Sequence, residues 1–441
     1  MTSHERRRPV ENATISNEVR SAQTVAPDRP VSRRWITYFA LAWMGVWMAQ
    51  LTPFQLVLPV QINGWLGLAA SEVPEDQWQR SVMSFGQISG IAAGFALIAF
   101  PLVGALSDRT TSRFGRRRPW IVIGVLSTVI GLSGLGFQHT WVGMAVFWSI
   151  VITGFSATAA ALTALISDQV PVNQRGVVSS WVSAPQALGI LLGVAVIGAL
   201  FGTRYTGPYL TLAICVVVLV APFVWYLNDP PHPTHKRSKL TVRTLLSELW
   251  ISPRQYPDFG WTLLGRVLIS IGNGLGTALL LQYLQFGLRL SNPVDKLTIA
   301  ASIYTLFVLF GALVTGQVSD RIGRRKPFVL AAGLAQALAA IGIVAVSNFP
   351  MTVVAAALLG AGYGCFLGVD QALATQVLPD SEDSGKDLGI MNIAMQVPQA
   401  LGPLIGALVV SATGGFSSVF VAAAVFGIAG SLAVLPIRGV R

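Results

Sequence analysis

The pattern with the clearest chemistry is a Gly-x-x-x-Asp-Arg stretch that occurs twice. The first copy places Asp108 ahead of the cluster Arg116–Arg118, and the second places Asp320 ahead of Arg324–Lys326. A carboxylate at a helix end can accept hydrogen bonds from arginine side chains or from the N–H groups of a facing helix N-terminus. We therefore predict an ionic latch at each copy, although arginines that only set membrane topology would leave the same pattern. The predicted latch residues are Gly104, Asp108, Arg109, Gly115, Arg116 and Arg117 in the first copy and Gly316, Asp320, Arg321, Gly323, Arg324 and Arg325 in the second.

One pair of opposite charges falls inside long apolar runs. Arg266 lies seven residues after Phe259, and Asp370 lies seven residues before Val377. At about 1.5 Å per residue, both would sit roughly 10 Å from the same membrane boundary. Charges at that depth are costly and are normally paired or functional. We predict an Arg266–Asp370 ion pair that either fixes two helices or gives Asp370 a role in proton coupling; two unpaired charges are the remaining alternative.

Uncharged polar side chains are more numerous in the apolar runs. Carboxamides donate and accept hydrogen bonds, and beside Trp or Tyr rings they suit a neutral, hydroxylated ligand. Each one alone is more often an interhelical hydrogen bond. The four that we predict to contact a small-molecule substrate are Gln50, Gln55, Asn273 and Gln396.

Other reactive groups are sparse. The two cysteines, Cys215 and Cys365, lie in apolar runs without metal-ligand spacing, as buried small hydrophobic residues do. The sequence contains no phosphate-binding loop, no metal-ligand cluster and no nucleophile–base arrangement. We therefore expect no enzymatic activity, no metal and no cofactor.

The elements that must position these residues are membrane-spanning helices. Of the 441 residues, 53% are hydrophobic and 11% are charged, whereas a soluble domain carries about 25% charged residues. A helix needs about 20 apolar residues to cross a bilayer. The twelve runs of this kind are Trp35–Ile62, Val82–Leu106, Trp120–Phe137, Trp141–Ile166, Val177–Phe201, Tyr209–Leu227, Phe259–Leu288, Leu297–Val318, Phe328–Val346, Met351–Val377, Leu388–Ser411 and Ser417–Ile437.

The basic residues lie mostly on one side of these predicted spans. With the N-terminus in the cytoplasm, 25 of the 30 Lys and Arg residues fall on the cytoplasmic side and 4 on the other. This bias follows the positive-inside rule and predicts that both termini are cytoplasmic. It also accounts for the net charge of +11 without nucleic acid as a partner. Asp168, at the cytoplasmic end of the fourth run, would be neutralised by Arg175 or by the Arg116–Arg118 cluster.

Two motifs recur at nearly the same spacing. The Gly-x-x-x-Asp-Arg stretch at 104–109 recurs 212 residues later, and Pro-Gln-Ala-Leu-Gly at 185–189 recurs 213 residues later. Each copy falls at the same place in its half, so a six-helix unit is used twice with parallel topology. The predicted organisation is a disordered cytoplasmic tail (1–34), an N-terminal half (35–227), a central cytoplasmic loop (228–258), a C-terminal half (259–437) and a short cytoplasmic tail (438–441).

These motifs resemble those of the major facilitator superfamily, whose halves carry Gly-x-x-x-Asp-Arg-x-Gly-Arg-Arg between their second and third helices. The second copy, DRIGRRK at 320–326, fits without a gap, and the resemblance covers Trp35–Ile437. The first copy, DRTTSRFGRRRP at 108–119, is longer and resembles the sucrose-type and glycoside-pentoside-hexuronide branches. The sequence departs from sucrose-type transporters in that its N-terminal spans carry no acidic residue near mid-membrane.

The resemblance implies an all-α membrane protein of two six-helix pseudo-repeats that works by alternating access, with the two latches gating the cytoplasmic side. We expect a monomeric, multi-pass secondary transporter in the lipid bilayer of the cytoplasmic membrane. Its substrate would be a small polar solute, a sugar or glycoside, with protons as candidate coupling ions for symport. Two alternatives stay open: an exporter of drugs or metabolites, and a non-transporting sensor or assembly protein. Exporters of this superfamily carry a Gly-Pro motif in the fifth helix, and here the similar Gly402-Pro403 falls in the eleventh run.

Overall fold

The computed structural model describes residues 30–68, 73–171, 174–201, 204–229, 254–376 and 384–437, and every secondary-structure element in these ranges is helical. The predicted tail up to residue 29, most of the predicted central loop and residues 438–441 lie outside this part of the chain. In chain order the elements are α2 (Arg33–Thr52), η1 (Pro53–Val57), α3 (Leu58–Trp65), α4 (Glu75–Arg109), α5 (Arg118–Leu135), α6 (Trp141–Gln169), α7 (Arg175–Phe201), α8 (Thr206–Tyr226), α10 (Pro257–Ala278), α11 (Leu280–Gln282), η3 (Tyr283–Gly287), α12 (Pro293–Ile322), α13 (Lys326–Ala345), α14 (Phe349–Gln376), α15 (Ser384–Thr413) and α16 (Ser417–Leu432).

The helices of the described chain have the length and composition of membrane spans. Eleven of them are long and apolar enough to cross a bilayer, and α16 is a shorter apolar helix at the place of the twelfth predicted span. Their outward side is apolar as well, since side chains such as Ile130, Ile214 and Leu306 are more than half exposed. Apolar surfaces of this extent belong in lipid. The predicted all-helical, multi-pass membrane fold is therefore confirmed, and the N-in orientation stays a prediction.

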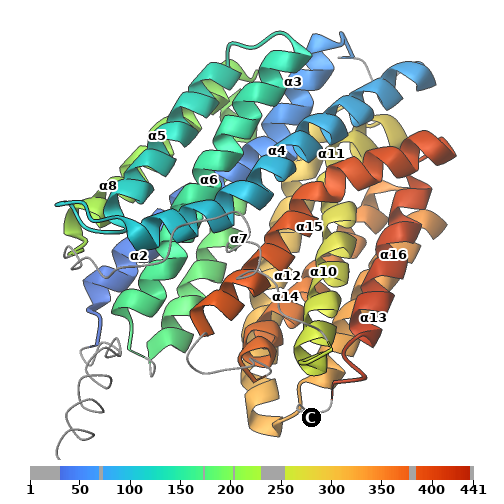
Figure 1. Ribbon diagram of the computed structural model, residues 1–441. Helices are drawn as coiled ribbons and strands as arrows, with labels where there is room; N and C mark the ends of the chain where they lie inside the picture. The colour runs from blue at the N-terminus through green and yellow to red at the C-terminus, as the bar shows by residue number, and fades with distance from the viewer. Residues whose placement is uncertain are drawn as a thin grey trace, which may run out of the picture.

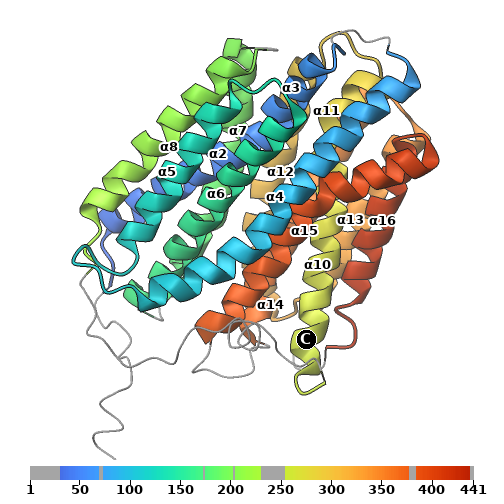
Figure 2. The same cartoon turned by 45° about the horizontal axis from the view of Figure 1, so that its top comes forward.

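The helices form two groups, shown in Figure 1 in blue to green (α2–α8) and in yellow to red (α10–α16). The groups meet where α4 lies against α15 and where α7 lies against α12 (Figure 2). Glycines permit close approach at and near these contacts: a Cβ added to Gly86 would lie 2.5 Å from the Ala407 Cβ, and one added to Gly402 would lie 3.0 Å from the Gly274 carbonyl carbon. Small residues let membrane helices pack backbone to backbone, and this is the role of Gly402 in the Gly-Pro motif.

The bundle has two distinct ends. Helix α2 begins, and the described chain ends, at the lower end in Figure 1, which we call the termini face; the opposite end is the far face. α4 ends at the termini face with the first latch motif, whereas α3 and α11 lie toward the far face.

Aromatic side chains fill the interior of the N-terminal half. Trp43 and Trp47 of α2 stack with ring centroids 5.8 Å apart, and Trp47 contacts Phe155 of α6 at 5.1 Å. Nearer the start of α2, Trp35 and Phe39 each contact Phe223 of α8, with ring centroids 5.6 Å apart. Such pairs contribute about 0.5–1.5 kcal/mol each beyond the area that they bury, so they hold α2 along its length.

Two helices contain π-helical turns that the sequence analysis did not predict. η1 follows α2 and contains Gln55, and η3 follows α11 and contains Gln285. These turns lie in the first and seventh predicted spans, which are the first helix of each half. A π-turn redirects the side chains that follow it and is frequent at functional sites. Pro53, at the start of η1, lacks a backbone N–H and so favours an irregular turn there.

Candidate functional site

The first latch motif forms a closed ionic cluster at the termini face. Arg117 donates to the Asp108 carboxylate at 2.5 Å and to the Asp168 carboxylate at 2.8 Å. Arg116 binds Asp168 at 2.6 Å, and its distance to Asp108 is 4.0 Å. Arg117 also donates to the Ser107 hydroxyl at 2.5 Å. This cluster joins the end of α4, the loop before α5 and the end of α6. Arg116 and Arg117 neutralise Asp168, as expected for the Arg116–Arg118 cluster, and the side chain of Arg175, the other group expected there, lies outside the described part of the chain.

Burial and charge act in opposite directions on Arg117. Burial alone would lower the pKa of its guanidinium, but the carboxylates of Asp168 and Asp108 raise the pKa above its ordinary value. Arg117 therefore carries its positive charge at every physiological pH.

The turn that leads into α5 depends on Gly115 and Asp229. The backbone N–H groups of Arg117 and Arg118 donate to one Asp229 carboxylate oxygen at 2.6 and 2.9 Å. A carboxylate at a helix N-terminus is favoured by the helix dipole. Gly115 has φ +99°, and a Cβ there would collide with Asp229. Gly115 is required here, whereas a Cβ at Gly104 would meet no atom within 4 Å, so close approach does not explain Gly104.

The second latch motif also turns through a left-handed glycine, Gly323, as the first does at Gly115. The side chain of its aspartate, Asp320, lies outside the described part of the chain. Gly323 ends α12 in the left-handed region, at φ +67°. Arg321 and Arg324 are exposed, and Arg325 is partly buried. A Cβ at Gly316 would lie 3.5 Å from the Gly368 carbonyl oxygen, an ordinary contact. The latch role of Asp320, Arg321, Arg324 and Arg325 stays a prediction.

One contact is repeated in both halves just after the latch. Arg118 donates to the carbonyl oxygens of Trp225 and Leu227 at 3.1 and 2.6 Å. Lys326, the matching basic residue ahead of a proline, donates to the carbonyl oxygens of Leu435, at 3.4 Å, and Ile437. In each half, a cation at the start of the third helix thus binds the end of the sixth, although the first loop is four residues longer.

The two charges inside the spans form a closed pair in the C-terminal half. The Arg266 Nε lies 3.1 and 2.8 Å from the two Asp370 carboxylate oxygens, and Nη2 also binds the carboxylate. The side chains are 2% and 3% exposed. They join α10 to α14 within an apolar cluster that includes Phe259 and Phe366. The structure thus brings together the two residues that the sequence paired, and their role in coupling stays a prediction.

A cavity with about 370 Å³ of unfilled space lies between the two halves, and we call it the inter-half cavity. It contains two of the four predicted substrate residues, Gln50 of α2 and Gln396 of α15. The side-chain oxygen (Oε1) of Gln50 and the hydroxyl of Ser89 are buried there without a hydrogen-bond partner in the described chain. The complete lining is Gln50, Leu51, Phe54, Ser89, Ala93, Trp148, Ile152, Gln396, Gln399 and Ala400.

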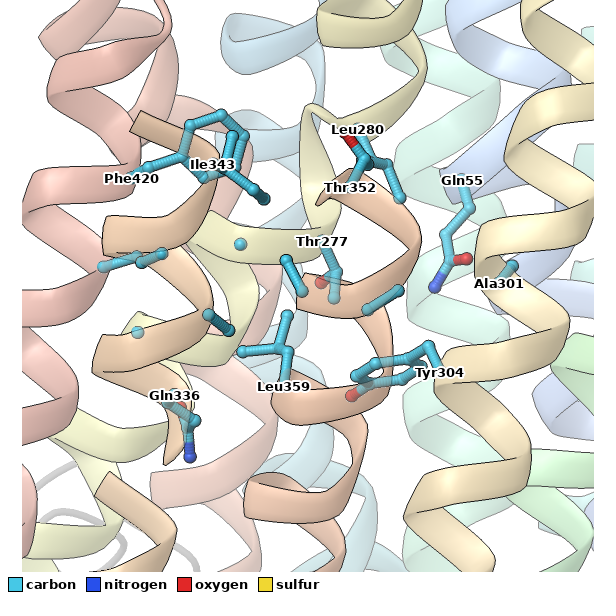
Figure 3. A pocket seen from close by; sticks show the side chains of 17 residues that line it. Gln55, Thr277, Leu280, Ala301, Tyr304, Gln336, Ile343, Thr352, Leu359 and Phe420 are labelled. Carbon is cyan, nitrogen blue, oxygen red and sulfur yellow. The ribbon is translucent and has the colours of Figure 1, made fainter. Parts of the chain in front are cut away.

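A second cavity, with about 620 Å³ of unfilled space, lies mainly among helices of the C-terminal half, and we call it the C-half cavity (Figure 3). Gln55 reaches it from η1. Tyr304 lines this cavity, and its hydroxyl donates a hydrogen bond of 3.0 Å to the side-chain oxygen of Asn273. Asn273 itself is not among the lining residues. The four predicted substrate residues are thus divided between two places.

A polar and aromatic contact joins the halves at the far face. Asn63 of α3 donates to the Gln285 side-chain oxygen at 2.8 Å, and Gln285 donates to the Leu68 carbonyl at 3.1 Å. Trp78 of α4 stacks on Phe416, with centroids 5.0 Å apart. The halves are therefore fastened to each other at this face.

Sequence reasoning did not select several residues that the structure places in these sites. Trp148 and Phe54 line the inter-half cavity, Asp229 caps α5, and Gln336 lines the C-half cavity. Aromatic residues are common throughout the spans, so composition could not select Trp148 and Phe54. No group of three His, Cys, Asp or Glu side chains that could hold a metal occurs in the described ranges.

Comparisons with known proteins agree with this architecture. The family model of the Major Facilitator Superfamily matches residues 77–297 and 262–440. The chain is 27% identical over 405 residues to the multidrug resistance protein MdtG of Yersinia enterocolitica, covering 90% of this chain and 92% of that protein. It is 25% identical over 400 residues to MdtG of Escherichia coli K12, covering 90% and 93%.

Solved structures of transporters share the fold. The human organic anion transporter MFSD10 aligns with a TM-score of 0.65 at 18% identity, over 92% of this chain and all of that chain. A POT family transporter in complex with a thioalcohol-conjugated peptide aligns with a TM-score of 0.65 at 14% identity, over 91% and 94%. The solved structures show the shared fold, while the family model and the MdtG relatives support the superfamily. None of them supports the sucrose-type or glycoside-pentoside-hexuronide branches that the first loop suggested.

Proposed function

The chain belongs to the major facilitator superfamily and is a membrane transporter rather than an enzyme, and from this premise we propose that it exports small, largely apolar organic molecules. The observation that carries the proposal is the lining of the inter-half cavity. Trp148, Phe54 and Ile152 supply apolar and aromatic surface, while Gln50 and Gln396 supply hydrogen-bonding groups. None of its described lining residues is ionisable. A site of this kind recognises a flat apolar body with a few polar groups.

The relatives support export over uptake. Both MdtG proteins are named multidrug resistance proteins and align over nine-tenths of this chain. The absence of a Gly-Pro motif from the fifth helix is only weak evidence against export. Gly189 in that helix already packs closely, since a Cβ there would lie 3.1 Å from the Met44 carbonyl oxygen. Small residues serve this helix contact without a proline.

Alternating access is the transport mechanism that fits two fastened halves around a cavity. The Asn63–Gln285 contact and the Trp78–Phe416 stack hold the far face together. Opening that face requires these contacts to break while the halves rock about the cavity. We assign the ionic cluster around Arg117 to the opposite, cytoplasmic side, where it stiffens the N-terminal half as a rigid unit.

Asp370 is the group that we assign to proton coupling. It is a carboxylate inside a span, bound to Arg266. Protonation would remove its charge and release the guanidinium, so the pair can convert proton binding into a change between two helices. A purely structural pair is the competing role. Asp370→Asn separates the two: it abolishes pH-driven transport but keeps substrate exchange if Asp370 couples, and it leaves pH-driven transport intact if it does not.

Sugar or glycoside uptake is the second candidate, and one observation favours it. Three carboxamides, Gln50, Gln396 and Gln399, line the same cavity, and carboxamides bind hydroxyl groups well. The aromatic and aliphatic share of the lining favours the apolar substrate. The two candidates differ in substrate and direction, so one transport experiment distinguishes them.

The experiment uses purified protein in proteoliposomes with an imposed pH gradient. We expect movement of neutral aromatic compounds such as chloramphenicol and no uptake of radiolabelled sucrose. Replacing Trp148 by Ala or Gln396 by Leu should slow transport about tenfold, the effect of losing roughly 1.4 kcal/mol of binding. The lipid-facing Leu338→Ala is the matched control, with an unchanged rate. Sucrose accumulation without movement of any aromatic compound would replace this proposal by the second candidate.

A further inference from the structure

The C-half cavity lies in a different place from the inter-half cavity. Its walls come from α10, α11, α12, α13, α14 and α16, and none of these helices is among the described lining of the inter-half cavity. Among the described lining residues, only Gln55 comes from the N-terminal half; in Figure 3 it enters from the side opposite Phe420 and Ile343. The cavity is therefore an internal space of one six-helix unit, with the other unit touching one end.

A buried carboxamide lies at one end of this cavity. Gln336 of α13 is 2% exposed, and neither its oxygen nor its nitrogen has a hydrogen-bond partner in the described chain. In Figure 3 it stands at the lower edge of the cavity, away from Gln55. A buried polar group without a partner is costly and rare in native structures. A hydrogen-bond donor or acceptor on a bound molecule would supply the missing partner of the Gln336 carboxamide.

The remainder of the lining sets the character of that molecule. Ala340 and Ile343 of α13 face Ala356 and Leu359 of α14 across an apolar space. Tyr304 is the only ionisable side chain in the described lining, and its hydroxyl already donates to Asn273. A charged ligand would lose its hydration here without gaining an opposite charge. The lining thus selects a neutral ligand.

We propose that the C-half cavity is a second binding site, for a neutral aromatic or alkyl compound that carries one amide, carbonyl or hydroxyl group. Its apolar body lies between α13 and α14, and its polar group bonds to Gln336. Because Gln55 touches the same space from the other half, an occupied site also contacts η1. The site requires neither the proposed direction of transport nor the proposed substrate.

Photo-crosslinking of purified protein with 4-benzoylbenzamide, mapped by peptide mass spectrometry, tests the proposal without a membrane gradient. We expect cross-links at cavity-lining positions such as Ala340, Ile343, Ala355 and Leu359. Gln336→Leu should weaken labelling about tenfold, because one net hydrogen bond is lost. This variant removes an unpartnered buried polar group, so its folding should be at least as stable as that of the parent, and thermal unfolding checks this.

Two further variants keep the outcome decisive. Ala356→Leu fills the apolar centre and should abolish the labelling, whereas Leu338→Phe, on the lipid-facing side of α13, should leave it unchanged. Cross-links confined to lipid-facing positions such as Ile341, or equal labelling in Ala356→Leu, would overturn the proposal. A phospholipid that copurifies in native mass spectra and blocks labelling until it is removed would assign the cavity to an acyl chain and would overturn it as well.

Discussion

The two halves place their buried charges in different environments. In the N-terminal half, Arg117 lies at the termini face, and the side chain of its partner Asp108 is 43% exposed. In the C-terminal half, Arg266 and Asp370 lie inside spans and are almost fully buried. A partly exposed pair can exchange its partner for water at little cost, whereas a closed pair must stay together or change protonation. The same six-helix unit thus has a structural ionic cluster in the N-terminal half and a candidate proton-dependent ion pair in the C-terminal half.

Structural contacts are shared between the halves, while candidate functional groups are not. Both halves turn through a left-handed glycine, Gly115 or Gly323, and both bind the end of the sixth helix with a cation, Arg118 or Lys326. Only the C-terminal half has a described ion pair deep in its spans. This difference teaches that the repeat preserves the contacts that build the unit and leaves its interior free to differ.

The largest expected effect comes from breaking the closed pair. Asp370→Asn leaves the Arg266 charge buried without a counter-ion and should lower the free energy of unfolding by about 3–5 kcal/mol. Thermal unfolding in detergent measures this. The double variant Arg266→Met with Asp370→Leu removes both charges and should recover most of the loss. A single variant as stable as the parent would show that the pair is not closed.

The ionic cluster of the N-terminal half should be less sensitive. Arg117→Gln removes charge-assisted hydrogen bonds to Asp108 and Asp168, and water can reach part of what remains, so about 1.5–3 kcal/mol should be lost. Arg113→Gln is the matched control, because Arg113 is exposed and lies over the Phe114 ring. The same unfolding assay compares them. If Arg117→Gln costs more than Asp370→Asn, the contrast between the halves is wrong.

The sequence predicted the fold well because each span is a long apolar run and because charges in such runs are rare. Arg266 and Asp370 could be paired from helical rise alone. Gln50, Gln55, Asn273 and Gln396 were predicted to contact one substrate. The structure places Gln50 and Gln396 in one cavity and Gln55 in another, because the π-turn at Pro53 alters the helix there. Asp229 was missed because its role depends on a turn closed across more than a hundred residues.

A smaller effect is expected from loosening the far face. Gln285→Leu removes hydrogen bonds to Asn63 and Leu68 that join the halves, worth about 1 kcal/mol each. A loss of about 1–2 kcal/mol should raise the population open at that face about five- to thirtyfold. The measurement is the reaction rate of Ser89→Cys with an impermeant maleimide added from the far-face side, with Cys215 and Cys365 replaced by Ala. An unchanged rate would remove this contact from the gate.

The smallest effect should come from the repeated cation. Lys326→Met loses the bonds to the carbonyls after α16 and should cost about 0.3–1 kcal/mol, the usual value for a cation at a helix C-terminus. Lys326→Arg should restore the parent stability, since Arg118 makes the same contact in the other half. Equal unfolding temperatures for Lys326→Met and the parent would show that this cation–carbonyl contact stabilises only the N-terminal half.

The central claim is that the two halves rock about the inter-half cavity. Spin labels at Arg113 and Arg324 report on the termini face, and labels at Gln77 and Ala345 report on the far face, all at exposed positions. Double electron–electron resonance in lipid, with and without a transported aromatic compound, measures the two distances. We predict that they change in opposite directions when the compound is added. Distances that stay constant, or that increase together, would contradict alternating access.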